Sequence, residues 1–345
     1  MARPPEIDFV FTYVHGTHPA WVSKYAAACA AAGREFDSTD IRHRDHGELG
    51  LAVRLVRLHC PWARRVYVVH AGEGLSPATA TELEGVAHLH VVAQDALLPA
   101  SVPRPCFNSL VVERYLHQLP GLSPVFVYCN DDMFVGRPLS PAHFVTAAGR
   151  VLSDVSAVPR AHRWAVPNLA ARHSLNAGRA FAERYDRPLP LYRVSHFPTA
   201  LCKATCKAVA DAFATSLPTT QFRAATDVNF VLLVALHALL PAHQPRLWLR
   251  SRAHLPGCAG GRPMAWAFVE RGAPALAWVL QHMPHRFCLN GLTEADESEF
   301  QAWKAAYLDA SQAALDAERW PLLAVGSCFP SAPEPSLRKA VGGRR

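Results

Sequence analysis

The chain lacks the two sequence features that direct a protein into or across a membrane. It contains no run of about 18 apolar residues, the minimum for a membrane-spanning helix. Its first residues, MARPPEIDFVFTYV, show no basic region followed by an apolar core and a small-residue cleavage site, so no signal peptide is expected. We therefore expect a cytoplasmic protein with no transmembrane segment; peripheral attachment to a membrane stays open.

Charged residues are also scarce. They make up 18% of the 345 residues, whereas half are hydrophobic, which excludes long disordered polyelectrolyte segments and favours a large core. The net charge of +7 points to an anionic partner, such as a phosphate-bearing substrate, a membrane surface or nucleic acid. Because no nucleic-acid-binding module is recognisable, we expect no nucleic-acid partner. The sequence does not define an oligomeric state.

Paired cysteine motifs are absent as well. The nine cysteines are an odd number scattered through apolar contexts, as expected of buried free thiols in a reducing compartment. Cys202 and Cys206 are spaced like half of a metal site, but no second pair at ligand spacing accompanies them. A structural role is therefore favoured for both.

Short segments rich in valine and aromatic residues predict strands in the first 150 residues. The predicted strands are 7–14, 65–70, 88–93 and 124–129, and the helix-compatible segments are 19–33, 46–59 and 108–118. This alternation indicates an α/β fold with a mainly parallel sheet and crossover helices. In such sheets, ligands bind beyond the carboxyl ends of the strands.

After residue 150 the strand signal weakens, and the chain is predicted to be mostly helical. The segments expected to be helical are 165–182, 198–216, 225–242, 264–281 and 294–318. No linker separates the halves, so we expect one catalytic domain, 1–325, in which the helical half, 151–325, packs on the α/β half, 1–150. Residues 326–345 have the composition of a flexible tail.

Two adjacent carboxylates follow the strand predicted at 124–129, in the motif Asn130-Asp131-Asp132. Burying such a pair is costly unless a cation or a proton compensates, and carboxylate oxygens are the ligands that Mg²⁺ prefers. A solvated turn favours Asn and Asp too. The motif alone leaves both alternatives open, and its position at a strand end favours the metal site.

The other polar motifs each have an ordinary structural explanation. Asp45 can cap a helix whose first turn holds Glu48. Glu113 lies on a predicted helix, where surface acids are common. His196 stands alone, and a lone histidine is more often structural than catalytic. Arg223 suits a phosphate group, but none of these residues outweighs its structural alternative individually.

Taken in order, these segments resemble the four conserved blocks of the Stealth family. These are bacterial capsular polysaccharide phosphotransferases, whose animal relatives include the catalytic subunit of the lysosomal-enzyme N-acetylglucosamine-1-phosphotransferase. The resemblance covers about residues 7–290, and its middle block is the most specific. The matching segments are IDFVFTYVHGTHPAW, RHRDHGELGLAVRLVRLHCPWARRVYVVHAG, FNSLVVERYLHQLPGLSPVFVYCNDDMFVGRPL, the region from His196-Phe197-Pro198 to Arg223, and FCLN.

The resemblance implies a nucleotide-sugar-transferase-like fold and a reaction of polysaccharide synthesis. In that reaction a sugar 1-phosphate moves from a UDP-sugar to a hydroxyl group of an acceptor glycan, and UMP is released. The resemblance assigns catalysis to Glu113, Asp132, His196 and Arg223, and a bound Mg²⁺ or Mn²⁺ to Asp131 and Asp132. The substrate-binding residues that it implies are Asp8, Thr12, Asp45, Glu48, Arg54, Asn108, Ser109, Asn130 and Asn290.

The chain departs from the family pattern at four positions. The family usually has Asn or Asp at His15, an acid at His18, Arg at Gly50 and Asp at Gly291. These departures would change the donor preference or weaken the activity.

Phosphoryl transfer depends on in-line positioning and on neutralisation of charge. We expect the acid pair to hold Mg²⁺ at the donor diphosphate, and Arg223 and Arg54 to bind phosphate oxygens. His196 is the candidate general base, with Asp132 as the alternative, and Glu113 orients that base or shares the metal shell. Two other functions stay open: a metal-dependent glycosyltransferase, which would release UDP, and a non-catalytic glycan-binding relative.

Overall fold

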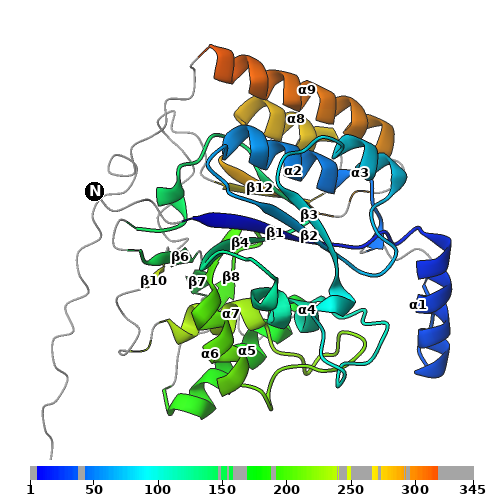
Figure 1. Ribbon diagram of the computed structural model, residues 1–345, viewed down its shortest axis with the longest axis vertical. Coiled ribbons are helices and arrows are strands. Elements are labelled where there is room, and N and C mark those ends of the chain that lie inside the picture. The colour runs from blue at the N-terminus through cyan, green and yellow to red at the C-terminus, as the bar shows by residue number, and fades with distance from the viewer. Residues whose placement is uncertain are drawn as a thin grey trace, which may run out of the picture.

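The computed structural model of the chain is an α/β structure with a mainly parallel central sheet, which confirms the predicted fold class (Figure 1). The described residues are 6–37, 43–146, 149–153, 155–157, 169–187, 192–238, 240, 247–249, 266–270, 273–290, 292 and 296–317. The predicted tail, 326–345, lies outside them, and the single domain 1–325 stays a prediction.

Five strands form the central sheet in the order β3-β2-β1-β4-β9. The first four are parallel, and β9 runs antiparallel to β4 at one edge. The four strands predicted in the first half are confirmed within two residues. The bounds are β1 (Ile7–Tyr13), β2 (Val66–His70), β3 (Leu89–Ala93), β4 (Val125–Asn130) and β9 (Thr199–Cys202).

Alternating side chains of β1 supply two separate cores, because successive residues of a strand point to opposite faces. Phe9 and Phe11 pack under α2 and α9, whereas Val10 faces the helices on the other side. Figure 1 shows α2, α3, α8 and α9 above the sheet and α4 to α7 below it. The bounds are α1 (Pro19–Ala31), α2 (Glu48–His59), α3 (Pro77–Glu82), α4 (Ser109–Tyr115), α5 (Leu169–Tyr185), α6 (Lys203–Ala212), α7 (Phe230–His237), α8 (Ala273–His282) and α9 (Glu297–Asp316).

The second half contains more strands than its sequence predicts. The segments 198–216 and 264–281, expected to be helical, open with β9 and β11 before their helices begin. These strands exist because of distant partners: β9 pairs with β4 and β11 with β12, and such pairing overrides weak local preference. The remaining strands are β5 (Met133–Val135), β6 (Val151–Ser153), β7 (Val155–Ala157), β8 (Tyr192–Val194), β10 (Leu247–Leu249), β11 (Trp266–Glu270) and β12 (Arg286–Asn290).

A few further features were expected from the sequence. Within the part of the chain that the structure describes, no helix is both long and apolar enough to cross a bilayer. The seven cysteines in that part are all free thiols, and all but Cys202 are buried. Cys202 and Cys206 are among these free thiols, and the structural role favoured for them stays a prediction.

Candidate functional site

The carboxyl ends of β1 and β4 lie side by side, because the two strands are parallel and Thr12 is in register with Asn130. The turn Asp131-Asp132 follows directly and leads into β5, which pairs with β12. The acid pair therefore stands at the edge of the sheet where ligands of α/β folds bind. This is the position that the sequence predicts for it.

A chain of hydrogen-bonding groups links this strand end to Glu113 on α4. The Thr12 hydroxyl donates to Asn130 Oδ1 over 3.3 Å, and the Tyr128 hydroxyl lies 2.6 Å from the same oxygen. The Tyr128 hydroxyl is also 3.1 Å from Glu113 Oε1. Burial raises the pKa of Glu113 to about 7, although Arg223, Tyr128 and His196 oppose the rise. Glu113 is thus half-protonated near neutral pH.

His196 stands beside Asp132 at the same edge. Its Nε2 lies 3.4 Å from Asp132 Oδ1 and 3.4 Å from the Asn130 amide nitrogen. Burial alone would lower the pKa of His196, but the carboxylates of Asp132 and Glu113 outweigh it, and the net pKa is raised. The side chain remains 42% exposed. An imidazole in this setting can be reached from solvent and is a stronger base than a free histidine.

Arg223 reaches the same cluster from the loop before α7. One of its terminal nitrogens donates to the hydroxyl of Ser109, at the first turn of α4, and its charge lowers the pKa of Glu113. Asn108, just before that helix, caps it by accepting from the backbone of Leu110. The Asn108 amide also donates to Asp227 over 2.9 Å, which fixes the loop that carries Arg223. Asn108 is fully buried, so its position favours a structural role over substrate contact.

Several other acidic side chains lie close to Asp132. Burial, and then the charges of Asp132, Glu48 and Asp45, hold the pKa of Asp131 well above its ordinary range. Burial also raises the pKa of Glu48 to about 7. Carboxylates that repel one another in this way create a negative potential that attracts cations.

Asp45 and Glu48 are held in place by contacts outside the acid pair. Asp45 accepts from the Tyr13 hydroxyl and from the backbone of Gly47, and Glu48 accepts from the backbone of His46 over 2.7 Å. A side chain of helix α9 also holds this turn in place. The buried ammonium of Lys304 donates to the carbonyl of Gly47 over 3.0 Å and pairs with Glu82.

Three ligand atoms in the cluster can hold a metal ion. They come from Asp132, His196 and Cys288, and all lie within 4.8 Å of one another. The Cys288 thiol donates to Asp132 Oδ2 over 3.3 Å, and the backbone of Leu289 donates to the carbonyl of Asp132. Strand β12 thus fixes the position of Asp132.

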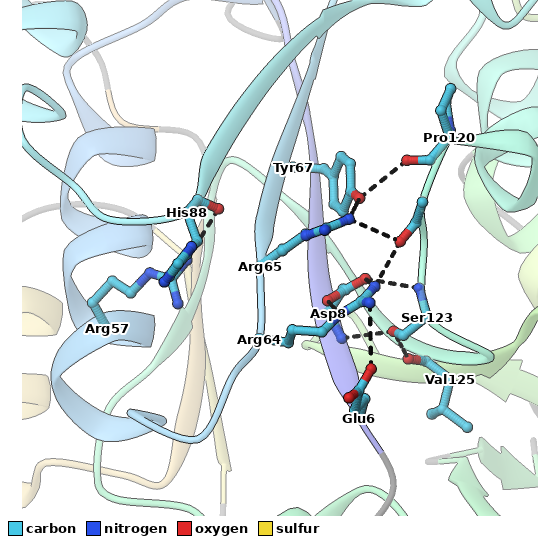
Figure 2. Close-up of polar contacts among 11 residues, drawn as sticks. Glu6, Asp8, Arg57, Arg64, Arg65, Tyr67, His88, Pro120, Ser123 and Val125 are labelled. Atoms are coloured by element: carbon cyan, nitrogen blue, oxygen red, sulfur yellow. Dashed lines mark hydrogen bonds and ion pairs between the residues drawn. The ribbon is translucent and has the colours of Figure 1, made fainter.

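Two of the predicted site residues, Asp8 and Arg54, lie away from the cluster, and the side chain of a third is not described. Asp8 lies near the other end of β1, where its buried carboxylate binds Arg64 and the backbone of Ser123 (Figure 2). These contacts favour a structural role for Asp8 over the contact with substrate that the resemblance implies. Arg54 is exposed on α2, two turns beyond Glu48. Asn290 ends β12, and its side chain lies outside what the structure describes.

Three of the positions that depart from the family pattern are described: two follow β1 and one lies on α2. His15 and His18 follow β1 with ring centroids 5.2 Å apart, and His18 caps α1 through its Nδ1. At Gly50, a Cβ would lie 2.0 Å from a Glu82 oxygen, so the Glu82 carboxylate occupies the place of a side chain there. Gly291 is not among the described residues.

Sequence reasoning missed two members of the cluster. Tyr128 is an ordinary strand aromatic by sequence, and only its even-numbered spacing from Asn130 places both side chains on one face. Cys288 is the second residue of a short apolar run, FCLN, where a cysteine is typical of a core. No sequence signal marks its contact with Asp132, which is 156 residues away.

Comparison with known proteins connects this geometry to a family. Residues 42–152 match the family model described as Stealth protein CR2, conserved region 2. An exopolysaccharide phosphotransferase of Streptomyces coelicolor is 28% identical over 319 residues, which cover 88% of this chain and 50% of that protein. A capsular polysaccharide phosphotransferase of Actinobacillus suis is 37% identical over 153 residues, covering 43% and 40%. The chain spans about half the length of the curated relatives it matches.

Solved structures show a weaker likeness. The galactosyltransferase LgtC in complex with donor and acceptor sugar analogues is 11% identical, with a TM-score of 0.42, covering 89% of this chain and 95% of that chain. The bifunctional glycosyltransferase WbbM is 9% identical, with a TM-score of 0.45, covering 90% and 52%.

Proposed function

We propose that the chain, whose residues 42–152 match conserved region 2 of the Stealth family, is a phosphotransferase of polysaccharide synthesis, as its relatives are named. Specifically, it moves a sugar 1-phosphate from a UDP-sugar to a hydroxyl group of an acceptor glycan. The products are a phosphodiester and UMP. The observation that carries this proposal is that residues distant in the sequence, Glu113, Asp132, His196 and Arg223, meet at one edge of the sheet.

A divalent cation fits the acid side of this site. The pKa of Asp131 is raised by burial and by the neighbouring acids, and the buried Asp132 Oδ1 lies 3.4 Å from His196 Nε2, at the long limit of a hydrogen bond. Asp131 and Asp132 would hold Mg²⁺ or Mn²⁺, ions that prefer carboxylate oxygens. When bound, the ion would neutralise charge on the donor diphosphate.

Arg223 supplies fixed positive charge for the transferred phosphate. Its guanidinium presents parallel N–H donors that match phosphate oxygens. The contact with the Ser109 hydroxyl, together with the Asn108–Asp227 bond behind it, limits the conformations open to the Arg223 side chain. Such preorganised charge lowers the barrier because it needs no rearrangement as the transition state forms.

His196 is the proposed general base for the acceptor hydroxyl. Its half-exposed ring can be approached by a glycan from solvent, and the Asp132 carboxylate stabilises the imidazolium formed on proton transfer. Asp132 is the alternative base. A pH profile separates the two roles, since a His196 base gives a rate that rises with pH through a pKa above that of free histidine.

Glu113 positions the strand end. The Tyr128 hydroxyl has one proton and lies within hydrogen-bonding distance of both Asn130 Oδ1 and Glu113 Oε1. Both contacts are satisfied when Glu113 carries its own proton, which agrees with its raised pKa. In this protonation state Glu113 orients Asn130, and through it the ring of His196.

The test is incubation with a panel of UDP-sugars, an acceptor glycan and Mg²⁺, with the nucleotide products resolved by chromatography. We expect acceptor-dependent release of UMP. A matched control is Asp211→Asn, because Asp211 is an exposed acid of α6 that pairs only with Lys207 among the described residues. Asp132→Asn should lose UMP release, whereas Asp211→Asn should keep it.

Two other outcomes would overturn the proposal. Release of UDP would identify a glycosyltransferase that transfers the sugar without its phosphate. Glycan binding with neither nucleotide released from any UDP-sugar in the panel would identify a non-catalytic relative.

A further inference from the structure

Two potential metal ligands next to Asp132 are not oxygens: they are a nitrogen of His196 and the sulfur of Cys288. His196 Nε2 lies 3.4 Å from one carboxylate oxygen of Asp132, and the Cys288 sulfur lies 3.3 Å from the other. The three residues come from separate segments: the turn after β4, the turn before β9, and β12. An imidazole, a thiol and a carboxylate therefore converge on one point.

The backbone holds these three side chains in their places. Cys288 is in register with Met133 in the antiparallel pair of β12 and β5, next to Asp132. His196 precedes the buried Phe197, and Thr199 is in register with Tyr128. The arrangement is thus a consequence of sheet pairing, and it does not depend on one flexible loop.

The donor set is typical of zinc sites. Zn²⁺ binds cysteine sulfur, histidine nitrogen and carboxylate oxygen in a tetrahedron, with bond lengths of about 2.0 to 2.3 Å that place neighbouring ligand atoms roughly 3.5 Å apart. The distances from His196 to Asp132 Oδ1 and from Cys288 to Asp132 Oδ2 are each close to this separation. The three atoms lie within 4.8 Å of one another, so a rotation of the half-exposed His196 ring can close the remaining gap. Mg²⁺, in contrast, favours oxygen ligands alone.

We propose that Asp132, His196 and Cys288 form an inhibitory site for Zn²⁺, with the fourth position open to water. Binding displaces the thiol proton of Cys288 to solvent and forms the sulfur–zinc bond. It also occupies His196 Nε2 and an oxygen of Asp132, the atoms that the proposed transfer uses. The inhibition rests on the proposed function, whereas the binding does not.

The two cations would compete, because both would use the carboxylate of Asp132. The acid side, with Asp131 and Glu48, favours an oxygen-seeking cation, whereas the side with His196 and Cys288 favours a sulfur-seeking one. Because one carboxylate serves both sides, the concentration of Zn²⁺ that halves the rate should rise with the Mg²⁺ concentration.

Cobalt is the probe, because Co²⁺ replaces Zn²⁺ at such sites and a bound thiolate gives a sulfur-to-cobalt charge-transfer band. The full chain is titrated with Co²⁺ without substrate, and Zn²⁺ is then added. We expect the band in the wild type and its loss on adding Zn²⁺. Cys288→Ser should abolish it and weaken binding at least about 100-fold, more than loss of an outer-shell partner. Cys202→Ser, which changes a more accessible thiol with no place in the cluster, should keep it.

A band that survives in Cys288→Ser, or no band in the wild type, would overturn the proposal. Since Cys288 is buried and its replacement can perturb folding, His196→Asn provides a second variant at a half-exposed position. It too should weaken Co²⁺ binding, and unchanged affinity would contradict the site. If Co²⁺ binds through Cys288 but no UDP-sugar releases UMP, the zinc site stands and the proposed function fails.

Discussion

The acids near the two ends of β1 have opposite electrostatic surroundings. Near its first residue, Asp8 is fully buried, and every oxygen of its carboxylate has a donor: Arg64 binds both, and the backbone of Ser123 binds one (Figure 2). Near its last residue, Asp131 and Glu48 have raised pKa values because burial and neighbouring acids disfavour their charges. Among the described residues, the first acid has a cationic partner, Arg64, whereas Asp131 and Glu48 form no ion pair.

We interpret this difference as one between structural acids and the acids of the proposed site. A buried carboxylate with a matched cation and backbone donors contributes to a stable fold, and removing the partner is strongly destabilising. Uncompensated acids destabilise the fold, and such groups are characteristic of sites that await a ligand. At the carboxyl end of the sheet, the missing positive charge would come from a cation, which would in turn bind the donor diphosphate.

The variant Asp132→Asn is expected to have the largest effect and tests this comparison most strongly. The change removes one negative charge but keeps the size of the side chain. We expect turnover to fall by about 10³-fold, or about 4 kcal/mol in the barrier, because the amide neither holds a cation nor stabilises the imidazolium of His196. Steady-state UMP release measures the effect, with far-UV circular dichroism as the check on folding. Turnover equal to that of the wild type would refute the assignment of Asp132.

The next effect concerns Glu113 and the pH dependence of stability. Its pKa is about 7 when folded against an ordinary 4.5, so between these values the folded state holds a proton that the unfolded state has lost. Raising the pH through this window must therefore destabilise the fold, by on the order of 3 kcal/mol. Glu113→Gln carries no such charge and should lose less stability between pH 5 and pH 8.

Urea unfolding of wild type and Glu113→Gln at both pH values tests this prediction. Other acids with raised pKa values are present in both proteins, so only the difference between the two matters. An identical loss of stability in the two proteins would show that Glu113 ionises as an ordinary glutamate.

The smallest effect is expected at Arg54. Because this residue is exposed on α2, beyond the turn that presents Glu48, Arg54→Ala should change kcat/KM less than about threefold and stability by less than about 0.5 kcal/mol. Kinetics with the UDP-sugar substrate measure it. A loss as large as that of Asp132→Asn would place Arg54 at the donor phosphates after all.

The sequence predicts the sheet better than the second half of the chain. Strands β1, β2 and β4 are continuous apolar runs with buried residues on both faces, and this pattern is visible locally. The segment Thr199–Cys202, in contrast, is a short TALC run whose strand conformation comes from β4, more than 70 residues earlier. Pairing over such a separation leaves little signal in the segment itself.

The site residues likewise divide into those that the sequence predicts and those that depend on distant strand pairing. The resemblance supplied Glu113, Asp132, His196 and Arg223, and the structure brings them together. Cys288 could not be found, since its contact with Asp132 depends on the pairing of β12 with β5. Asp8 could have been excluded: it precedes the carboxyl end of its strand by five residues, about 17 Å in extended chain, and ligands bind at that end.

A paired unfolding measurement tests the contrast between the two ends most directly. Asp8→Asn and Asp131→Asn make the same chemical change at opposite ends of the sheet, and both are unfolded in urea at pH 8 in buffer free of divalent cations. We expect Asp8→Asn to lose about 2 kcal/mol, less than for a fully buried ion pair because Arg64 is partly exposed. Asp131→Asn should gain stability. A loss at Asp131 equal to that at Asp8 would contradict the account.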